Sequence, residues 1–224
     1  MKKSESDALN EFLIELGNEL AELIEMMQVL GEDCDEHYAT IQSNDNQMHR
    51  RAYVRAVLAL MEGILYRMKR TAFHVGRTIG SISMAEIFMI DGVSIEINDK
   101  GEAYPKPVFI KFLHNIKFSF KVYSKSVGSS FELSLGGIGW QKLLEAVKVR
   151  DRLMHPKTTA SLQVTDNGVE AAKKAFDWFL ISYMLCSYYA QKAARAKSSH
   201  ASEGMAAIDI KIQEWQTKLN NIGN

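Results

Sequence analysis

Three polar residues, Arg150, Asp151 and His155, stand at the end of a predicted amphipathic helix and carry side chains suited to acid–base chemistry. The apolar stripe of that helix consists of Trp140, Leu143, Leu144, Val147 and Met154. By helical periodicity, positions 150 and 151 belong to the same stripe, where apolar residues are expected. Buried charges are unfavourable unless they are paired, and such exceptions are common at functional sites. Pro156 disfavours helical geometry in the residue before it, so we expect the helix to end near Met154 with His155 projecting.

These residue types fit metal-free cleavage of RNA. The 2′-hydroxyl of RNA is an internal nucleophile, so cleavage needs a group that transfers protons and a cation that stabilises charge on the phosphoryl oxygens. His155 suits the first task because histidine is the side chain that can both accept and donate a proton near neutral pH. Arg150 suits the second because its guanidinium donates two hydrogen bonds to phosphate, and Asp151 could orient either group.

Arg150 and His155 point about 140° apart on a straight helix, at roughly 100° per residue. Either the helix unwinds before Pro156, or two protomers combine their residues in one site. Glu62, within the apolar run VLALMEGIL, is a further polar residue in an apolar setting. It is expected to form an ion pair with Arg55 or Arg150, because an isolated buried carboxylate is strongly disfavoured.

The motif resembles the signature of HEPN domains, in which Arg, a polar residue, a short spacer and His lie at a helix end, often before Pro. The matching residues are Arg150, Asp151 and, after three further residues, His155. Two other pairs have a similar spacing, Arg67/His74 and Arg195/His200. They lack an adjacent polar residue on an apolar stripe and a following proline, so context selects the first match.

The resemblance covers about residues 50–195. Residues 51–70 resemble the first core helix of the family, with Glu62 as its glutamate. The GIGWQKLL segment resembles the entry to the motif helix. Residues 162–180 resemble the connection into the last core helix. The resemblance implies a metal-independent ribonuclease that dimerises with both motifs in a shared cleft. It also implies a biological role as a toxin in a toxin–antitoxin or phage-defence system.

The predicted fold is all-α: an HEPN-like bundle of four or five core helices with a small β-hairpin insertion and extra N- and C-terminal helices. Residues 1–224 are expected to form one domain. Its parts are an acidic helix and loop at 1–48, a core at 49–197 with the hairpin near 93–104, and an amphipathic helix at 204–222. Periodicity predicts helices at 5–30, 49–74, 108–125 and 167–197 beside the motif helix, with a polar loop at 31–48 and a glycine-rich loop at 128–139.

Both terminal helices carry an apolar seam with steps of three and four residues, from Leu9 to Leu30 and from Met205 to Ile222. Such seams bind a second copy or another protein, or they pack on the core of their own chain. Packing on the core is favoured, because two or three heptads fall short of a coiled coil.

Charge is unevenly distributed although the net charge is zero. Residues 1–49 contain 12 acidic residues and two lysines, whereas residues 50–224 contain 25 Lys and Arg and 15 acidic residues. A basic body suits a polyanionic partner such as RNA. The candidate RNA-binding residues are Lys117, Lys121, Lys148, Arg152 and Lys157. The acidic segment either competes with RNA for that surface or attracts the basic part within one fold.

No sequence pattern predicts a metal site or a cofactor. The EDCDEH segment at 32–37 has metal-binding residue types without a known ligand spacing, and it fits a solvated acidic loop. Cys34 and Cys186 match no redox motif, which suits a reducing cytosol. The start of the chain lacks the apolar core of a secretory signal, and the apolar run at 175–190 is too short for a membrane span. We therefore expect a cytoplasmic protein that is not bound to a membrane.

The expected function is metal-independent cleavage of RNA at a site shared by the two protomers of a homodimer, with an antitoxin or other protein as a further partner. The first alternative is a non-catalytic HEPN module that binds RNA, a nucleotide or a partner protein. The second is a purely structural helical dimer, because an Arg–Asp pair often only ties helices together and a His–Pro helix end is often only a cap.

Overall fold

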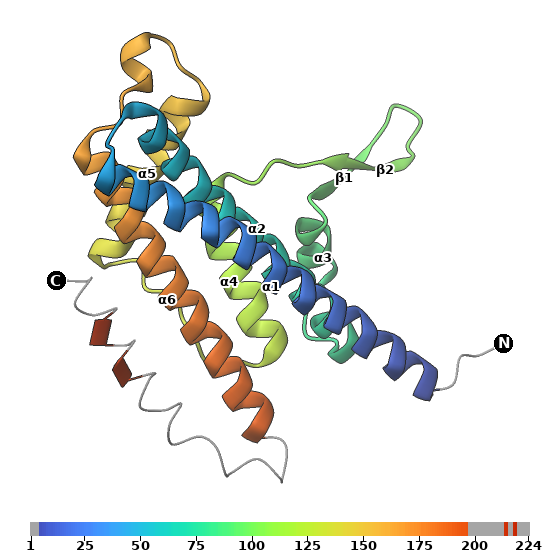
Figure 1. Ribbon diagram of the computed structural model, residues 1–224. Coiled ribbons are helices and arrows are strands. Elements are labelled where there is room, and N and C mark those ends of the chain that lie inside the picture. The colour runs from blue at the N-terminus through green and yellow to red at the C-terminus, as the bar shows by residue number, and fades with distance from the viewer. Residues whose placement is uncertain (1–4, 197–212, 215–216, 219–224) are drawn as a thin grey trace.

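The computed structural model describes residues 5–196, 213–214 and 217–218, and this part of the chain is a helical bundle with one small hairpin (Figure 1). Its elements are α1 (Glu5–Ser43), α2 (Gln47–Ile79), α3 (Met84–Ile90), β1 (Val93–Ile97), β2 (Ala103–Pro107), α4 (Phe112–Val127), α5 (Ile138–Met154), the 3₁₀-helix η1 (Thr159–Leu162) and α6 (Asp166–Ala196). The predicted all-α fold with a hairpin insertion is confirmed. Within the predicted helix at 204–222, the structure describes only 213–214 and 217–218, and these four residues are helical.

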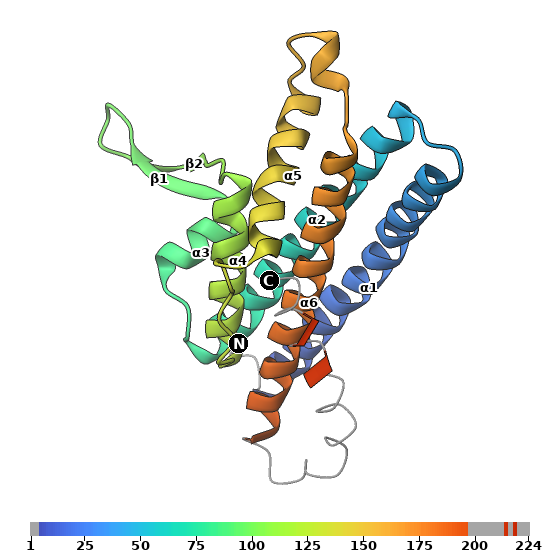
Figure 2. The same ribbon diagram turned by 90° about the vertical axis from the view of Figure 1, so that its left-hand side faces the viewer.

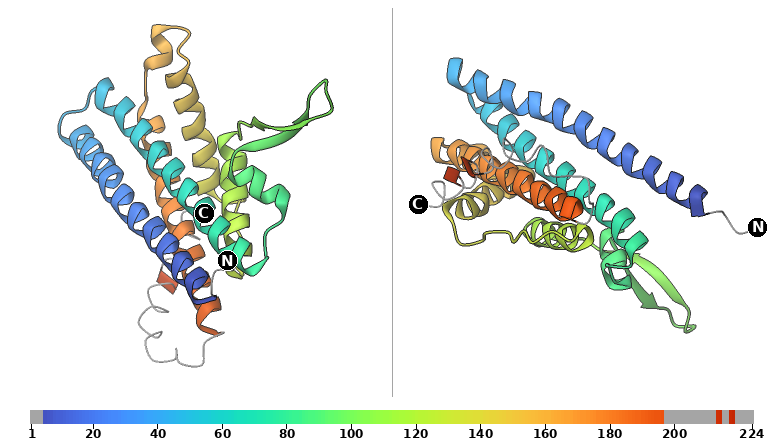
Figure 3. Two further views of the ribbon diagram at one scale, coloured as in Figure 1. Left: turned by 90° about the vertical axis from the view of Figure 1, so that its right-hand side faces the viewer. Right: turned by 90° about the horizontal axis from the view of Figure 1, so that it is seen from below.

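Helix α2 is the centre of the bundle, with α1 on one side and α4, α5 and α6 on the other (Figure 3). Asn46 begins the helix, because its side chain accepts hydrogen bonds from the backbone N–H groups of Met48 and His49. Gly80 ends it in the left-handed conformation, with φ 69°. Between positions 53 and 65 of α2, the buried residues form four neighbouring pairs, at 53–54, 57–58, 60–61 and 64–65, as expected for a helix that is covered on two sides.

The prediction of a polar loop at 31–48 is wrong for most of that segment, because α1 continues to Ser43. Cys34 and Ile41 are buried, and the ring of Tyr38 lies 5.3 Å from that of Tyr53 on α2. These apolar positions continue the helical spacing of the preceding seam, and the acidic residues between them form the solvent face. Only the short stretch around Asn44 to Asn46 turns the chain.

Ion pairs connect the acidic α1 to the basic second half of α2. Arg67 binds Glu19 at 3.0 Å and Glu22 at 2.8 Å, and His74 Nδ1 lies 3.0 Å from Glu15. Of the two interpretations of the charge asymmetry, these contacts favour attraction between the acidic and basic parts within one fold.

The hairpin of β1 and β2 extends away from the bundle (Figure 2). The hairpin was predicted near 93–104, but β2 extends further and includes Pro105 and Pro107, which lie opposite Ile95 and Val93. Backbone hydrogen bonds flank the paired strands at Asn98–Glu102 and Gly92–Val108. Because bonded and non-bonded pairs alternate in an antiparallel ladder, both prolines stand at non-bonded positions, where a backbone N–H would point away from β1.

Gly139 allows α5 to approach α6 closely. A methyl group added at this position would lie 2.4 Å from the indole ring of Trp178, too close for any contact. Trp140 follows, and its ring meets that of Trp178 edge-on at 5.7 Å. The GIGW sequence therefore fixes the distance between the motif helix and the last core helix. None of the described helices has a stretch long and apolar enough to cross a membrane.

Gly139→Ala should lower the free energy of unfolding by about 1–3 kcal/mol, since the added methyl group forces the two helices apart. Urea denaturation monitored by circular dichroism measures this change. Gly31→Ala is the matched control, because Gly31 is also helical and no atom lies within 4 Å of an added methyl group. That variant should be neutral or stabilising by up to about 1 kcal/mol. Equal stability of the two variants would contradict the close approach at Gly139.

Candidate functional site

Three helices bring their side chains together around Arg150, in the last turns of α5. Arg150 Nη2 lies 2.5 Å from Glu62 Oε1 on α2, which confirms the predicted ion pair of Glu62 and selects Arg150 over Arg55. The guanidinium also lies over the ring of Phe112, the first residue of α4, 5.3 Å from its centroid. The Arg150 side chain as a whole remains 25% exposed, so part of it is accessible to solvent.

Glu62 lies on the solvent-facing stripe of α2, together with Arg55, Ala59 and Tyr66. The prediction that Glu62 occupies an apolar setting is therefore wrong, because the helical period turns position 62 outward while its neighbours face the core. The carboxylate is 44% exposed. An ion pair of this exposure contributes little to stability.

Asp151 is also outside the core, with a side chain that is 64% exposed. Its carboxylate lies 3.9 Å from Arg150 Nη1, at the outer limit of an ion pair. The buried stripe of α5 passes through Val147 and ends at Leu153, whereas Met154 is exposed. The predicted buried stripe was therefore correct up to Val147. In the last turn of the helix the buried residue is Leu153 and not Met154, and the prediction that Asp151 and Met154 face the core is wrong.

His155 lies directly after α5, which ends at Met154 as predicted. Its backbone N–H donates to the carbonyl of Asp151 at 3.0 Å, and its side chain is exposed. Within the described residues, the imidazole makes no hydrogen bond or ion pair with Arg150, Asp151 or Glu62. One chain thus brings Arg150 and Glu62 together but does not join His155 to them.

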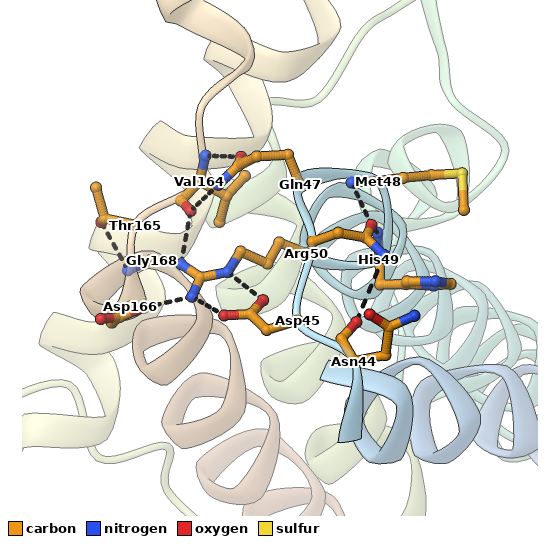
Figure 4. A network of polar contacts seen from close by, with 11 residues as sticks. Asn44, Asp45, Gln47, Met48, His49, Arg50, Val164, Thr165, Asp166 and Gly168 are labelled. Atoms are coloured by element: carbon orange, nitrogen blue, oxygen red, sulfur yellow. Dashed lines mark hydrogen bonds and ion pairs between the residues drawn. The ribbon is translucent and has the colours of Figure 1, made fainter. Parts of the chain in front are cut away.

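A network of polar contacts anchors the segment that follows the motif (Figure 4). The side-chain amide of Gln47, at the start of α2, donates to the carbonyl of Val164 at 3.0 Å and accepts from its N–H at 2.8 Å. Arg50 Nη1 donates to the same carbonyl at 3.0 Å. Arg152 of the motif helix donates to the neighbouring carbonyl of Gln163 at 2.8 Å. The chain between His155 and α6 is therefore attached at its far end to both α2 and α5.

Arg50 is the central cation of that network. It binds Asp45 before α2 and Asp166 at the start of α6, the latter at 2.5 Å. Hydrogen bonding from Arg50 holds the pKa of Asp45 below its ordinary value, and the two carboxylates raise the pKa of Arg50. Sequence reasoning missed Gln47, Arg50 and Phe112, because the contacts that join them to the motif region are made with residues about 40 to 120 positions away in the chain.

The candidate RNA-binding residues divide into two groups. Lys148 and Lys157 are exposed near the motif without an ion-pair partner in the described part of the chain, whereas Arg152 is engaged with Gln163. Lys117 and Lys121 lie farther along the bundle. Lys117 Nζ is 5.1 Å from the centre of the Trp140 ring, at the first turn of α5.

Lys117 and Lys121 line a pocket of about 490 Å³ between α4 and the segment after it. Lys125 completes the row of cations, although it is bound to Glu86 at 2.7 Å. The walls include Phe120 and Phe131. This pocket combines a cationic rim with aromatic side chains.

Metal-ligating and thiol chemistry have little support in the described residues. Among them, no three His, Cys, Asp or Glu side chains are grouped so that they could hold a metal ion.

Both cysteines are buried, and burial raises the pKa of Cys34 to about 12 and that of Cys186 to about 11. Neither thiol therefore forms a nucleophilic thiolate near neutral pH. The EDCDEH residues lie on α1, where the acidic side chains face solvent.

Comparison with known proteins identified no relative. No protein-family model matches the chain, and neither a curated protein nor a solved structure matches it.

Glu62→Gln should change the free energy of unfolding by less than about 1 kcal/mol, because the ion pair with Arg150 is open to solvent. Urea denaturation measures the difference. Glu170→Gln is a suitable control, since it breaks an ion pair of similar exposure with Lys174 on α6. If Glu62→Gln lowers the free energy of unfolding several times more than Glu170→Gln does, the Arg150–Glu62 ion pair has a structural role.

Proposed function

We propose that this chain is a metal-independent endoribonuclease of the HEPN type that acts as a cytoplasmic homodimer. The proposal includes its biological role as the toxin of a toxin–antitoxin or phage-defence system. The proposed catalytic residues are Arg150, Asp151 and His155, and Glu62 is the supporting residue that binds Arg150. The observation that carries it is the accessibility of Arg150, which is held by Glu62 and Phe112 yet remains partly open to solvent.

In this proposal the Arg150–Glu62 contact orients Arg150 rather than stabilises the fold. An exposed ion pair adds at most about 1 kcal/mol to stability. The contact does, however, restrict the orientation of the guanidinium, because Glu62 binds one of its two terminal nitrogens. The other terminal nitrogen, Nη1, lies only loosely against Asp151 and keeps donors for a phosphoryl oxygen.

In the proposed reaction, the 2′-hydroxyl of a ribose attacks the adjacent phosphorus, and the bond to the next 5′-oxygen breaks. His155 transfers protons between the nucleophile and the leaving group. Arg150 stabilises the charge that develops on the phosphoryl oxygens. The products are a 2′,3′-cyclic phosphate, or the phosphate formed by its hydrolysis, and a free 5′-hydroxyl group.

The proposed site needs two protomers, because His155 makes no contact with Arg150 of its own chain. A two-fold axis beside the ends of the two α5 helices would place the Arg150 of one protomer opposite the His155 of its partner. The exposed side chains of Asp151 and His155 leave this end of the helix free for such an approach.

A non-catalytic module that binds RNA or a nucleotide is the second candidate, and the pocket beside α4 favours it. The ammonium groups of Lys117 and Lys121 suit phosphates, and the partly exposed ring of Phe131 suits the apolar face of a base. Binding at this pocket would be weakened by Lys121→Glu and unaffected by His155→Ala.

His155→Ala should reduce the rate of RNA cleavage by about 10² to 10⁴, the usual effect of losing a general acid or base. Arg150→Lys should also cleave RNA much more slowly, because the ammonium group of lysine does not reproduce the two coplanar hydrogen-bond donors of the guanidinium. The measurement is cleavage of total RNA in the presence of EDTA, followed by identification of the 3′ ends. DNA, which lacks the 2′-hydroxyl, should remain intact.

The matched control is His200→Ala, since His200 has a similar spacing from an arginine but not the surrounding motif. Its rate should equal that of the wild type. If His155→Ala cleaves RNA as fast as the wild type, or if EDTA abolishes cleavage, the proposed mechanism is wrong. RNA binding without cleavage would favour the second candidate.

The protein should be a dimer by light scattering at micromolar concentration. An equal mixture of Arg150→Ala and His155→Ala chains tests whether the site is shared. After exchange, the mixture should recover about one quarter of the wild-type activity, because half of the dimers are mixed and each retains one complete site. A monomeric mass, or a mixture as inactive as its components, would contradict the shared site.

A further inference from the structure

An apolar groove of about 520 Å³ separates the first half of α1 from the last turns of α6. Its walls include Leu16 and Leu20 from α1, Met68 and Val75 from α2, and Tyr183 and Ala190 from α6. Both outer helices lie against α2 but not closely against each other, and they diverge toward this end of the bundle (Figure 1). We refer to this space as the α1/α6 groove.

The α1 side of the groove is left open in the described part of the chain. Leu20 is 57% exposed, and Leu13 and Ile24 are exposed to a similar extent on adjoining turns of the same face. Within the seam predicted for α1, Leu23 is buried at the floor of the groove, whereas Leu20 on its rim is exposed. Adjoining apolar side chains of this kind usually mark a surface that binds another element.

We propose that the α1/α6 groove is the docking site of the C-terminal segment of the same chain, residues 204–222. This segment has an apolar face consisting of Met205, Ile208, Ile212, Trp215, Leu219 and Ile222. The four residues of it that the structure describes support an amphipathic helix. Gln213, Glu214, Thr217 and Lys218 are helical and exposed, and all belong to the opposite, polar face.

The position of the groove selects this segment as the occupant. Ala190, Gln191 and Ala194 line the groove, so it begins within the last turns of α6. The seven residues at 197–203 can span up to about 25 Å, which is enough for the chain to reverse its direction. A helix that returns antiparallel to α6 from Ala194 to Tyr183 covers about 16 Å, or three turns. The apolar face of the segment and the open seam of α1 then bury each other.

Trp215 provides the test, because it lies on the apolar face of the segment. The other two tryptophans, Trp140 and Trp178, are buried in the core, so iodide quenching of the full-length protein reports on Trp215. The contribution of Trp215 is the difference between the wild type and Trp215→Phe. Docking predicts a blue-shifted Trp215 emission that iodide quenches weakly.

Leu20→Glu places a charge on the groove and should raise the iodide quenching constant of Trp215 severalfold, with a red shift of its emission. Ile14→Glu is the matched control, since Ile14 is exposed on a different face of α1 and does not line the groove. It should behave as the wild type. Leu20 is largely exposed on the bundle itself, so Leu20→Glu should keep the helical circular dichroism of Ile14→Glu, and the release of Trp215 then reports on docking rather than on unfolding.

The same comparison can be made from the other side of the contact, which leaves the bundle unaltered. Ile212→Glu should release Trp215, whereas Gln213→Glu, on the polar face, should not. A Trp215 that is freely quenched in the wild type, or equal quenching in Leu20→Glu and Ile14→Glu, would overturn the proposal. Protection that disappears on dilution would also overturn it, because the occupant would then be the segment of a second copy. None of these results depends on RNA cleavage.

Discussion

The burial of α2 on two sides is the constraint on which the rest of the structure depends. Its paired apolar positions require α1 on one face and α4, α5 and α6 on the other, so that only a narrow stripe remains open. Glu62 belongs to that stripe, and it meets Arg150 where α5 passes the edge of α2. The position of the candidate site therefore follows from how the core is filled. Large apolar side chains such as Met61 and Leu65 keep the helices in this arrangement, and their burial is the dominant favourable contribution to folding.

Much of the fold was predictable from local signals. Pro156 predicted the end of α5, and the glycine-rich loop predicted the end of α4. The helix predicted at 49–74 stopped short of Gly80, where α2 ends. The errors occurred where local and tertiary signals differ. The acidic residues around Cys34 suggested a loop, although the few apolar positions among them are sufficient to hold α1 against α2. The short helix α3 depends on a Ser83–Glu86 capping box and on Lys125, a partner from α4.

The candidate site was predictable to the extent that one helix determines it. Periodicity placed Arg150 on the apolar stripe of α5, and the cost of an unpaired charge predicted that Glu62 pairs with Arg55 or Arg150, of which the structure selects Arg150. Periodicity could not give the width of the buried stripe, so Asp151 was wrongly predicted to face the core. Nor could it identify Phe112, which reaches Arg150 only because α4 begins beside the end of α5. Contacts between two copies of a chain are even less accessible, because no local pattern records which exposed faces meet.

The two prolines of β2 have a consequence for the behaviour of the protein at high concentration. A hairpin that extends from a bundle presents open strand edges, and exposed Ile95 and Ile97 make such a ribbon prone to join others. At Pro105 and Pro107, the outer edge of β2 lacks the N–H groups with which an incoming strand would pair. Sheet growth on that side is therefore blocked in the folded protein, so the hairpin can carry apolar side chains outside the bundle without starting a fibril from this edge.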